Sequence, residues 1–163
     1  MENISHIREK KDEGASMVGI YRFTIRDAVT GAIKRVYEYK NLIPTVGRAQ
    51  IAKALSGDIT TAQEIRITHT SLGTGATAPA NGDTQLQTEV FRKPVASSTF
   101  SNNVLYVTAF YTAPEVSGSF LEAGIHINAT ATANSGVLFS RVAISVTKSV
   151  TETLTIDYTV TIT

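Results

Sequence analysis

Charged residues inside apolar stretches are the first candidates for chemistry in this sequence. Glu89, Glu122 and Asp157 lie among apolar neighbours, as do Arg92 and Arg141. Two carboxylates about 5–10 Å apart across a groove would suit glycoside hydrolysis, but aromatic residues to line such a groove make up only 7% of the chain, with no Trp. We therefore predict no catalytic residue. The acids are expected to pair with the arginines or to cap loops, because a buried charge needs a partner; the ion-pair candidates are Glu89, Arg92, Glu122 and Arg141.

A glycine-rich segment follows a short apolar run and could suggest a phosphate-binding loop. Gly73, Thr74 and Gly75 form this segment, but no Gly-Lys-Ser/Thr follows it and no helix pattern begins there. The residues up to about Thr88 are typical of a long loop. Glycines after a strand favour a sharp turn. We expect this loop to face outward, with Gly73, Thr74, Gly75 and Asp83 as candidates for contact with a partner.

The sequence contains few features that would support metal or thiol chemistry. The three histidines, His6, His69 and His126, have no helical ligand spacing and no H-E-x-x-H motif. A metal site assembled across strands is the alternative to surface or hydrogen-bonded histidines. The chain has no cysteine, which excludes a disulfide framework, a thiolate metal site and a cysteine nucleophile. We expect no metal and no cofactor.

The overall composition limits the class of partner. The chain has 163 residues, 42% of them hydrophobic, with a formal net charge of +1. This length suits one domain with its own core. A near-zero net charge gives no electrostatic footprint for nucleic acid, and no apolar run is long enough for a spanning helix. We therefore expect neither a nucleic-acid nor a membrane partner.

Hydrophobic periodicity predicts mostly strands. Alternation predicts a hairpin over 17–40, whereas Pro44, a one-sided apolar pattern and Gly57 predict a short α-helix near residues 44–56. Further strands are expected around 65–67, 91–100, 104–113, 120–129, 137–146 and 153–163, with 91–100 pairing with 104–113. The predicted fold is mainly β, an antiparallel β-sandwich of jelly-roll or immunoglobulin-like type. Residues 1–16 are expected to form an extended, flexible N-terminal arm, and 17–163 a single β-sandwich domain.

An ordered set of short motifs runs through most of the chain. It comprises Asn41-Leu42-Ile43, Gly47, Ile51, Ser71-Leu72-Gly73-Thr74-Gly75, Ala78-Pro79, Asp83-Thr84-Gln85-Leu86, Glu89-Val90, Arg92, Glu122-Ala123-Gly124-Ile125, Leu138-Phe139-Ser140-Arg141 and a final Thr-Ile-Asp-Tyr-Thr-Val-Thr-Ile. This set resembles tailed-bacteriophage virion structural proteins over about residues 37–163. The motifs are weak singly, and the resemblance brings no catalytic residues with it.

The resemblance implies a non-enzymatic structural role in the virion, after synthesis in the host bacterial cytoplasm. A tail, collar or baseplate appendage is the leading expectation, and a capsid decoration (cement) protein that stabilises the head is the alternative. A further alternative is a carbohydrate-binding module that recognises a host surface glycan. The expected partners are neighbouring virion proteins and copies of this chain in a homo-oligomer, with a trimer as the first guess from the symmetry common among phage appendages.

Overall fold

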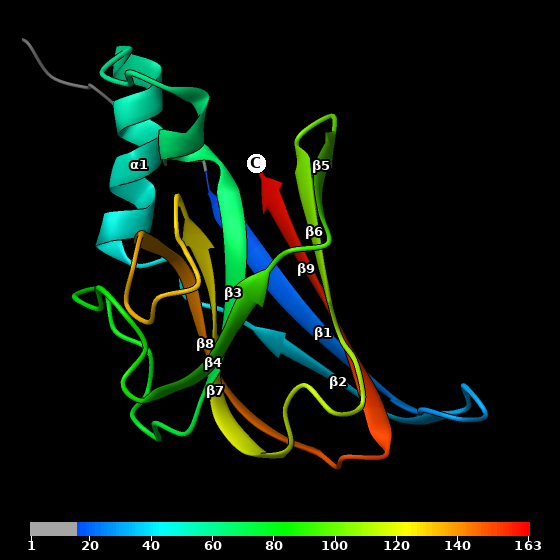
Figure 1. The fold of residues 1–163 in the computed structure, drawn as a ribbon. Helices are drawn as coiled ribbons and strands as arrows, with labels where there is room; N and C mark the ends of the chain where they lie inside the picture. Colours follow the sequence, from blue (N-terminus) through cyan, green and yellow to red (C-terminus); the bar gives the residue numbers. More distant parts are fainter. Residues whose placement is uncertain (1–15) are drawn as a thin grey trace, which may run out of the picture.

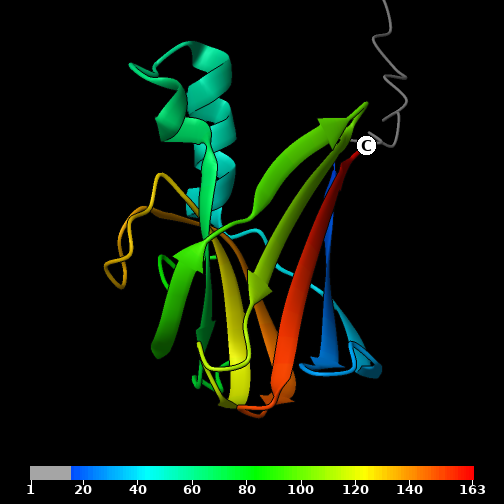
Figure 2. The same ribbon diagram turned by 45° about the vertical axis from the view of Figure 1, so that its right-hand side comes forward.

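The protein is a sandwich of two antiparallel sheets, as the sequence predicts (Figures 1 and 2). The computed structural model describes residues 16–163, so the predicted arm lies outside the described residues except for Ser16. The five-stranded sheet has the order β2 (Ile33–Lys40), β1 (Met17–Asp27), β9 (Glu152–Ile162), β6 (Val104–Tyr111) and β5 (Ser97–Ser101). The four-stranded sheet has the order β4 (Glu89–Pro94), β3 (Ile67–Gly73), β7 (Gly118–Ile127) and β8 (Val137–Lys148).

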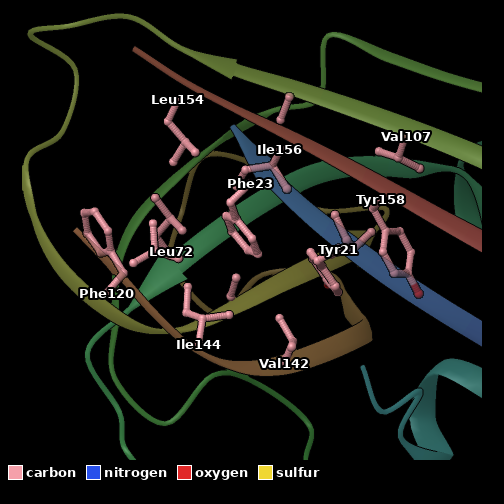
Figure 3. Close-up of a cluster of buried hydrophobic side chains, with 14 of the residues drawn as sticks. Tyr21, Phe23, Leu72, Val107, Phe120, Val142, Ile144, Leu154, Ile156 and Tyr158 are labelled. Atoms are coloured by element: carbon pink, nitrogen blue, oxygen red, sulfur yellow. The ribbon is translucent and has the colours of Figure 1, made fainter. Parts of the chain in front are cut away.

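The core lies between the two sheets and follows the alternation of the strands. In β9, Leu154, Ile156 and Tyr158 are buried, while Thr155 and Asp157 between them lie on the other face. These side chains meet residues such as Leu72 and Val142 from the four-stranded sheet (Figure 3). Burial of an aliphatic or aromatic side chain contributes about 1.5–3 kcal/mol, so this layer is the main source of stability.

The predicted helix is present as α1 (Thr45–Ser56), which begins one residue after Pro44. Gly57 ends it in the left-handed conformation, with φ of 75°. Gly47 is buried against β8, where an added Cβ would lie 2.5 Å from the Phe139 carbonyl oxygen. The absent side chain therefore lets the helix pack closely against the four-stranded sheet. A short 3-10 helix, η1 (Ala62–Ile65), follows α1 and leads into β3.

One strand prediction is wrong. The segment 91–100 does not form a single strand paired with 104–113: β4 ends at Pro94 in one sheet, and β5 begins at Ser97 in the other. Between them, the Val95 N–H donates to Thr68 O at 2.9 Å and the Ala96 N–H donates to Thr108 O at 2.7 Å. The chain thus crosses from one sheet to the other at a corner of the sandwich.

The hairpin over 17–40 forms as predicted, from β1 and β2. Ser16, assigned from sequence to the arm, is instead tied to the end of β9, because its backbone exchanges two hydrogen bonds with Thr163. The strand expected around 65–67 is β3, which begins at Ile67 and runs to Gly73.

Candidate functional site

The candidate residues meet on the outer face of the four-stranded sheet, in rows that cross its strands. One row contains Arg92, Ser71, Gly124 and Arg141, one from each strand. The next contains Glu89, Gly73 and Glu122. The row on the other side contains His69 and His126. Strand register thus sets a row of acids beside a row of arginines, and it brings together Glu122 and Arg141, which are 19 positions apart in sequence.

Glu122 is the centre of the first ion pair and is fully buried. Its Oε1 accepts the Gly75 N–H at 3.1 Å and the Thr88 N–H at 2.7 Å, and its Oε2 accepts the Gln87 N–H at 3.0 Å. Arg141 completes the set, with Nε 3.0 Å and Nη2 2.9 Å from Oε2. Five donors therefore replace the water that a buried carboxylate loses.

Arg141 links this pair to the middle of the 74–88 loop. Its Nη1 lies 2.7 Å from Asp83 Oδ2, and its Nη2 lies 3.1 Å from the Thr77 carbonyl oxygen. Partial burial raises the pKa of Asp83, but hydrogen bonds from the Ala80 N–H and from Arg141 outweigh it and hold this pKa below its usual value. The loop is therefore fixed at both ends by Glu122 and in its middle by Arg141.

The two glycines of the predicted loop segment serve a close approach and not a left-handed turn. Neither Gly73 nor Gly75 has a positive φ. A Cβ at Gly73 would lie 2.6 Å from Glu122 Oε1, and one at Gly75 would lie 2.5 Å from the same atom. Both glycines are buried within the protomer, so of this segment only Thr74 is exposed to a partner. Asp83 is half-buried.

The second pair, Glu89–Arg92, is bidentate and nearly inaccessible. The Arg92 Nε and Nη2 atoms lie 2.7 Å from Glu89 Oε1 and Oε2, and these side chains are 2% and 3% exposed. The Arg92 Nη1 also donates to the Ser135 carbonyl oxygen at 2.7 Å, in the loop between β7 and β8. Each arginine thus neutralises one glutamate and fixes one loop.

A serine–histidine pair between the two ion pairs was not predicted from the sequence. Ser71 Oγ lies 2.6 Å from His126 Nε2, and both residues are at most 1% exposed. Such a pair resembles a nucleophile and its base. However, burial and then the nearby Arg92 cation lower the pKa of His126 to about 3, whereas a base needs a pKa near the working pH. Leu86 is buried over the adjacent Gly124, so the loop also covers this pair.

The third acid does not join these pairs. Asp157 lies within β9 on the outer face of the five-stranded sheet, and its Oδ1 accepts the Thr108 hydroxyl at 2.8 Å. The expectation that it pairs with Arg92 or Arg141, or caps a loop, is therefore wrong. Within residues 16–163, no cluster of three acidic or histidine side chains is arranged to hold a metal ion, and no helix of that part is long and apolar enough to cross a membrane.

Comparison of the chain with models of known protein families, with curated proteins and with solved structures gave no match.

Proposed function

We propose that this protein is a non-enzymatic structural component of a tailed-bacteriophage virion, which assembles through symmetric subunit contacts in a tail, collar or baseplate appendage. The ordered motifs between Asn41 and Thr163 support the virion setting. The open face of the five-stranded sheet supports the assembly role, and it is the observation on which the proposal chiefly depends.

That face is rich in hydroxyls and carries exposed apolar side chains. Thr155, Thr159 and Thr161 of β9 lie along its centre. Around them lie large hydrophobic residues that are about two-fifths exposed: Val18, Ile20, Val36, Tyr106 and Phe110. Five strands spaced by about 4.8 Å give a face of the order of 500 Å². This approaches the roughly 800 Å² that one partner contributes to a typical specific interface.

The charges on this face are of both signs and lie mainly on β1 and β2, where the register places Arg22, Arg26, Glu38 and Lys40 on it. Arg22 pairs with Glu38 at 3.0 Å across β1 and β2, and the register sets Asp157 on the other side of Arg22. Both side chains of the pair are more than half exposed, so they can exchange partners with a neighbouring subunit. The part of the face formed by β9 and β6 carries one charge, Asp157, beside the exposed Tyr106 and Phe110. Exposed hydrophobic residues with little charge are typical of an interface.

Virions of the phage that encodes this chain provide the test. Mass spectrometry of purified particles should detect the protein, and a genomic deletion should be complemented by the wild-type chain. Ile20→Asp should leave circular dichroism unchanged but prevent incorporation, because it replaces an exposed apolar side chain of the face, beside the central strand β9, with a charge. Val29→Asp is the matched control, since Val29 is 93% exposed in the β1–β2 turn. Particles that lack the protein, or that incorporate both variants equally, would refute the proposal.

Copy number separates the two structural roles. Hundreds of copies per particle would indicate a capsid decoration protein, whereas a small multiple of the tail symmetry would indicate an appendage. Immunogold labelling of intact particles gives the location independently, because head and tail are distinguishable in negative stain.

The carbohydrate-binding alternative has one specific observation in its favour. A polar pocket of about 290 Å³ is formed by the 74–88 loop and Arg141, with a lining that includes Asp83, Thr84, Gln85 and Gln87. Amides, hydroxyls and a carboxylate are the groups that bind sugar hydroxyls. Dose-dependent binding on a glycan array, abolished by Gln85→Ala and retained by Val29→Asp, would favour this alternative; Gln85 is exposed, so its loss should not unfold the protein.

A further inference from the structure

The four sheet edges of the described residues differ in how they are protected against pairing with another strand. The β8 edge is covered by Leu42, which exchanges two backbone hydrogen bonds of 3.0 Å with Arg141. The β2 edge carries Lys34, Arg35 and Lys40, and the β4 edge carries Lys93 and Pro94. Charged residues and proline are the usual protection of an edge strand.

Strand β5 has no such protection. Its sequence, Ser97-Ser98-Thr99-Phe100-Ser101, is uncharged, and all five residues are exposed. Its other edge pairs with β6, and it forms the outer end of the five-stranded sheet (Figures 1 and 2). Phe100 is 80% exposed. An uncharged edge with an exposed aromatic residue favours the addition of another strand.

The two sheets diverge toward the end of the sandwich at which β5 lies (Figure 2). An apolar cavity lies at this end, beside the β5 edge. Its volume is about 340 Å³, and its lining comes from α1, from η1 and from strands of both sheets. Apolar side chains such as Ile51, Leu105 and Phe139 form most of the wall, and Ser98 of β5 forms part of it. An apolar cavity of roughly 150 Å³ can hold a benzene ring, so this one has room for a phenylalanine side chain.

We propose that two copies of this chain pair through their β5 edges, with Phe100 of each copy entering the apolar cavity of the other. An antiparallel pair about a two-fold axis through Thr99 sets Phe100 of one copy opposite Ser98 of the second copy. Because Ser98 lines the cavity, the ring arrives at its entrance. The same contact occurs twice, so the surface is self-complementary, as a two-fold interface requires.

The observations favour a second copy as the occupant over a charged partner. The strand and most of the cavity wall have no charge to attract one, whereas an uncharged strand pairs with itself without repulsion. Two aromatic rings and two five-residue strands bury of the order of 1,000 Å² in total, at the low end for a specific interface. The dimer should therefore dissociate on dilution. This inference does not depend on the virion role.

Analytical ultracentrifugation across a concentration series tests the pairing. The wild-type chain should show a reversible monomer–dimer equilibrium. Phe100→Asp should weaken dimerisation about tenfold or more, because it removes the aromatic anchor of each half of the interface. Val29→Asp is the control: Val29 is 93% exposed in the β1–β2 turn, away from the β5 edge and from the open face of the sheet. A wild-type chain that stays monomeric, or dimers equally sensitive to both substitutions, would overturn the proposal.

Cysteine cross-linking tests the register. Since the chain has no cysteine, Thr99→Cys introduces a single thiol directly opposite its own copy, with Cβ atoms about 4.5–5.5 Å apart. This variant should form a disulfide-linked dimer on mild oxidation, much faster than Thr155→Cys on the open face of β9. Equal rates for the two variants would refute β5 pairing even if the chain dimerises, and would direct attention to the open face instead.

Discussion

The buried Glu122–Arg141 pair leads to the sharpest test of the structure. Glu122→Gln keeps the shape of the side chain but removes its charge and replaces one oxygen with an amide donor. The amide nitrogen must then face donors only, because Gly75, Gln87, Thr88 and Arg141 all donate to this carboxylate. We therefore expect the 74–88 loop to lose the hydrogen bonds that hold it at Glu122, so that this part of the protein opens locally.

The magnitude follows from burial. Glu122 is fully buried and the side chain of Arg141 is 3% exposed, so loss of the carboxylate leaves a buried cation whose remaining full charge partner is Asp83. Removal of one partner from a buried pair typically lowers the free energy of unfolding by about 3–5 kcal/mol. A domain of this size has about 5–15 kcal/mol in total. The variant should therefore fold at low temperature but melt well below the wild type.

Urea unfolding followed by circular dichroism gives the change in stability, and hydrogen exchange gives its location. In Glu122→Gln, the amides of Gly75, Gln87 and Thr88 should lose protection before the core of β9 does. Asp157→Asn is the matched control, because this half-buried acid accepts one hydroxyl hydrogen bond. Its substitution should lower stability by less than about 1 kcal/mol.

A double-mutant cycle with Arg141→Met separates the pair from its surroundings. If the two side chains act as a unit, the double variant should be less destabilised than the sum of the single variants. The view of Glu122 as the support of the loop would be refuted if Glu122→Gln lowered the free energy of unfolding by less than about 1 kcal/mol. It would also be refuted if Asp157→Asn lowered it as much as Glu122→Gln does.

Three further predictions concern other parts of the fold. Between pH 6.5 and 5, the free energy of unfolding should fall by about 2 kcal/mol. His126 takes up a proton in the unfolded chain with a pKa of 6.5, whereas in the folded protein its pKa is about 3. Stability therefore rises with pH over this window, and His126→Gln should flatten this pH dependence in urea titrations. Gly75→Ala should destabilise by about 1–3 kcal/mol, since its Cβ would lie 2.5 Å from Gln87 Cβ, whereas Gly82→Ala, with open space around it, should change the melting temperature little. Lys148→Met should destabilise by about 2–4 kcal/mol, because the buried Lys148 Nζ donates to the Ala113 and Val116 carbonyl oxygens at 2.8 and 2.7 Å; an unchanged denaturation midpoint would contradict this.

Local patterns in the sequence predict single elements well and contacts between them poorly. The alternation of Leu154, Ile156 and Tyr158 predicts β9 because a period of two is visible within one segment. Proline cannot donate a hydrogen bond within a sheet, so Pro94 already indicates in the sequence that the segment 91–100 is divided. Asp157 alternates with the exposed-face threonines of β9, so its position away from the ion pairs could also have been read from the pattern.

The pairing of the candidate residues could not be predicted in this way. The residue types indicate that two acids and two arginines need partners. A β-bulge in β4 brings Glu89 to the same face as Arg92, three residues later, and the pairing of β7 with β8 decides that Glu122 meets Arg141. Ser71 and His126 are 55 positions apart, and only the pairing of β3 with β7 brings them together. The roles of Gly73 and Gly75 likewise depend on a glutamate from another strand.

The position of β9 has a consequence for how the protein is made. This strand lies between β1 and β6, yet it follows every other strand in the sequence. Until it emerges from the ribosome, no strand lies between β1 and β6, and the five-stranded sheet remains in two separate parts. Productive folding should therefore wait for the last segment of the domain, and a nascent chain stalled before β9 should depend on chaperones to shield those open strands from self-association.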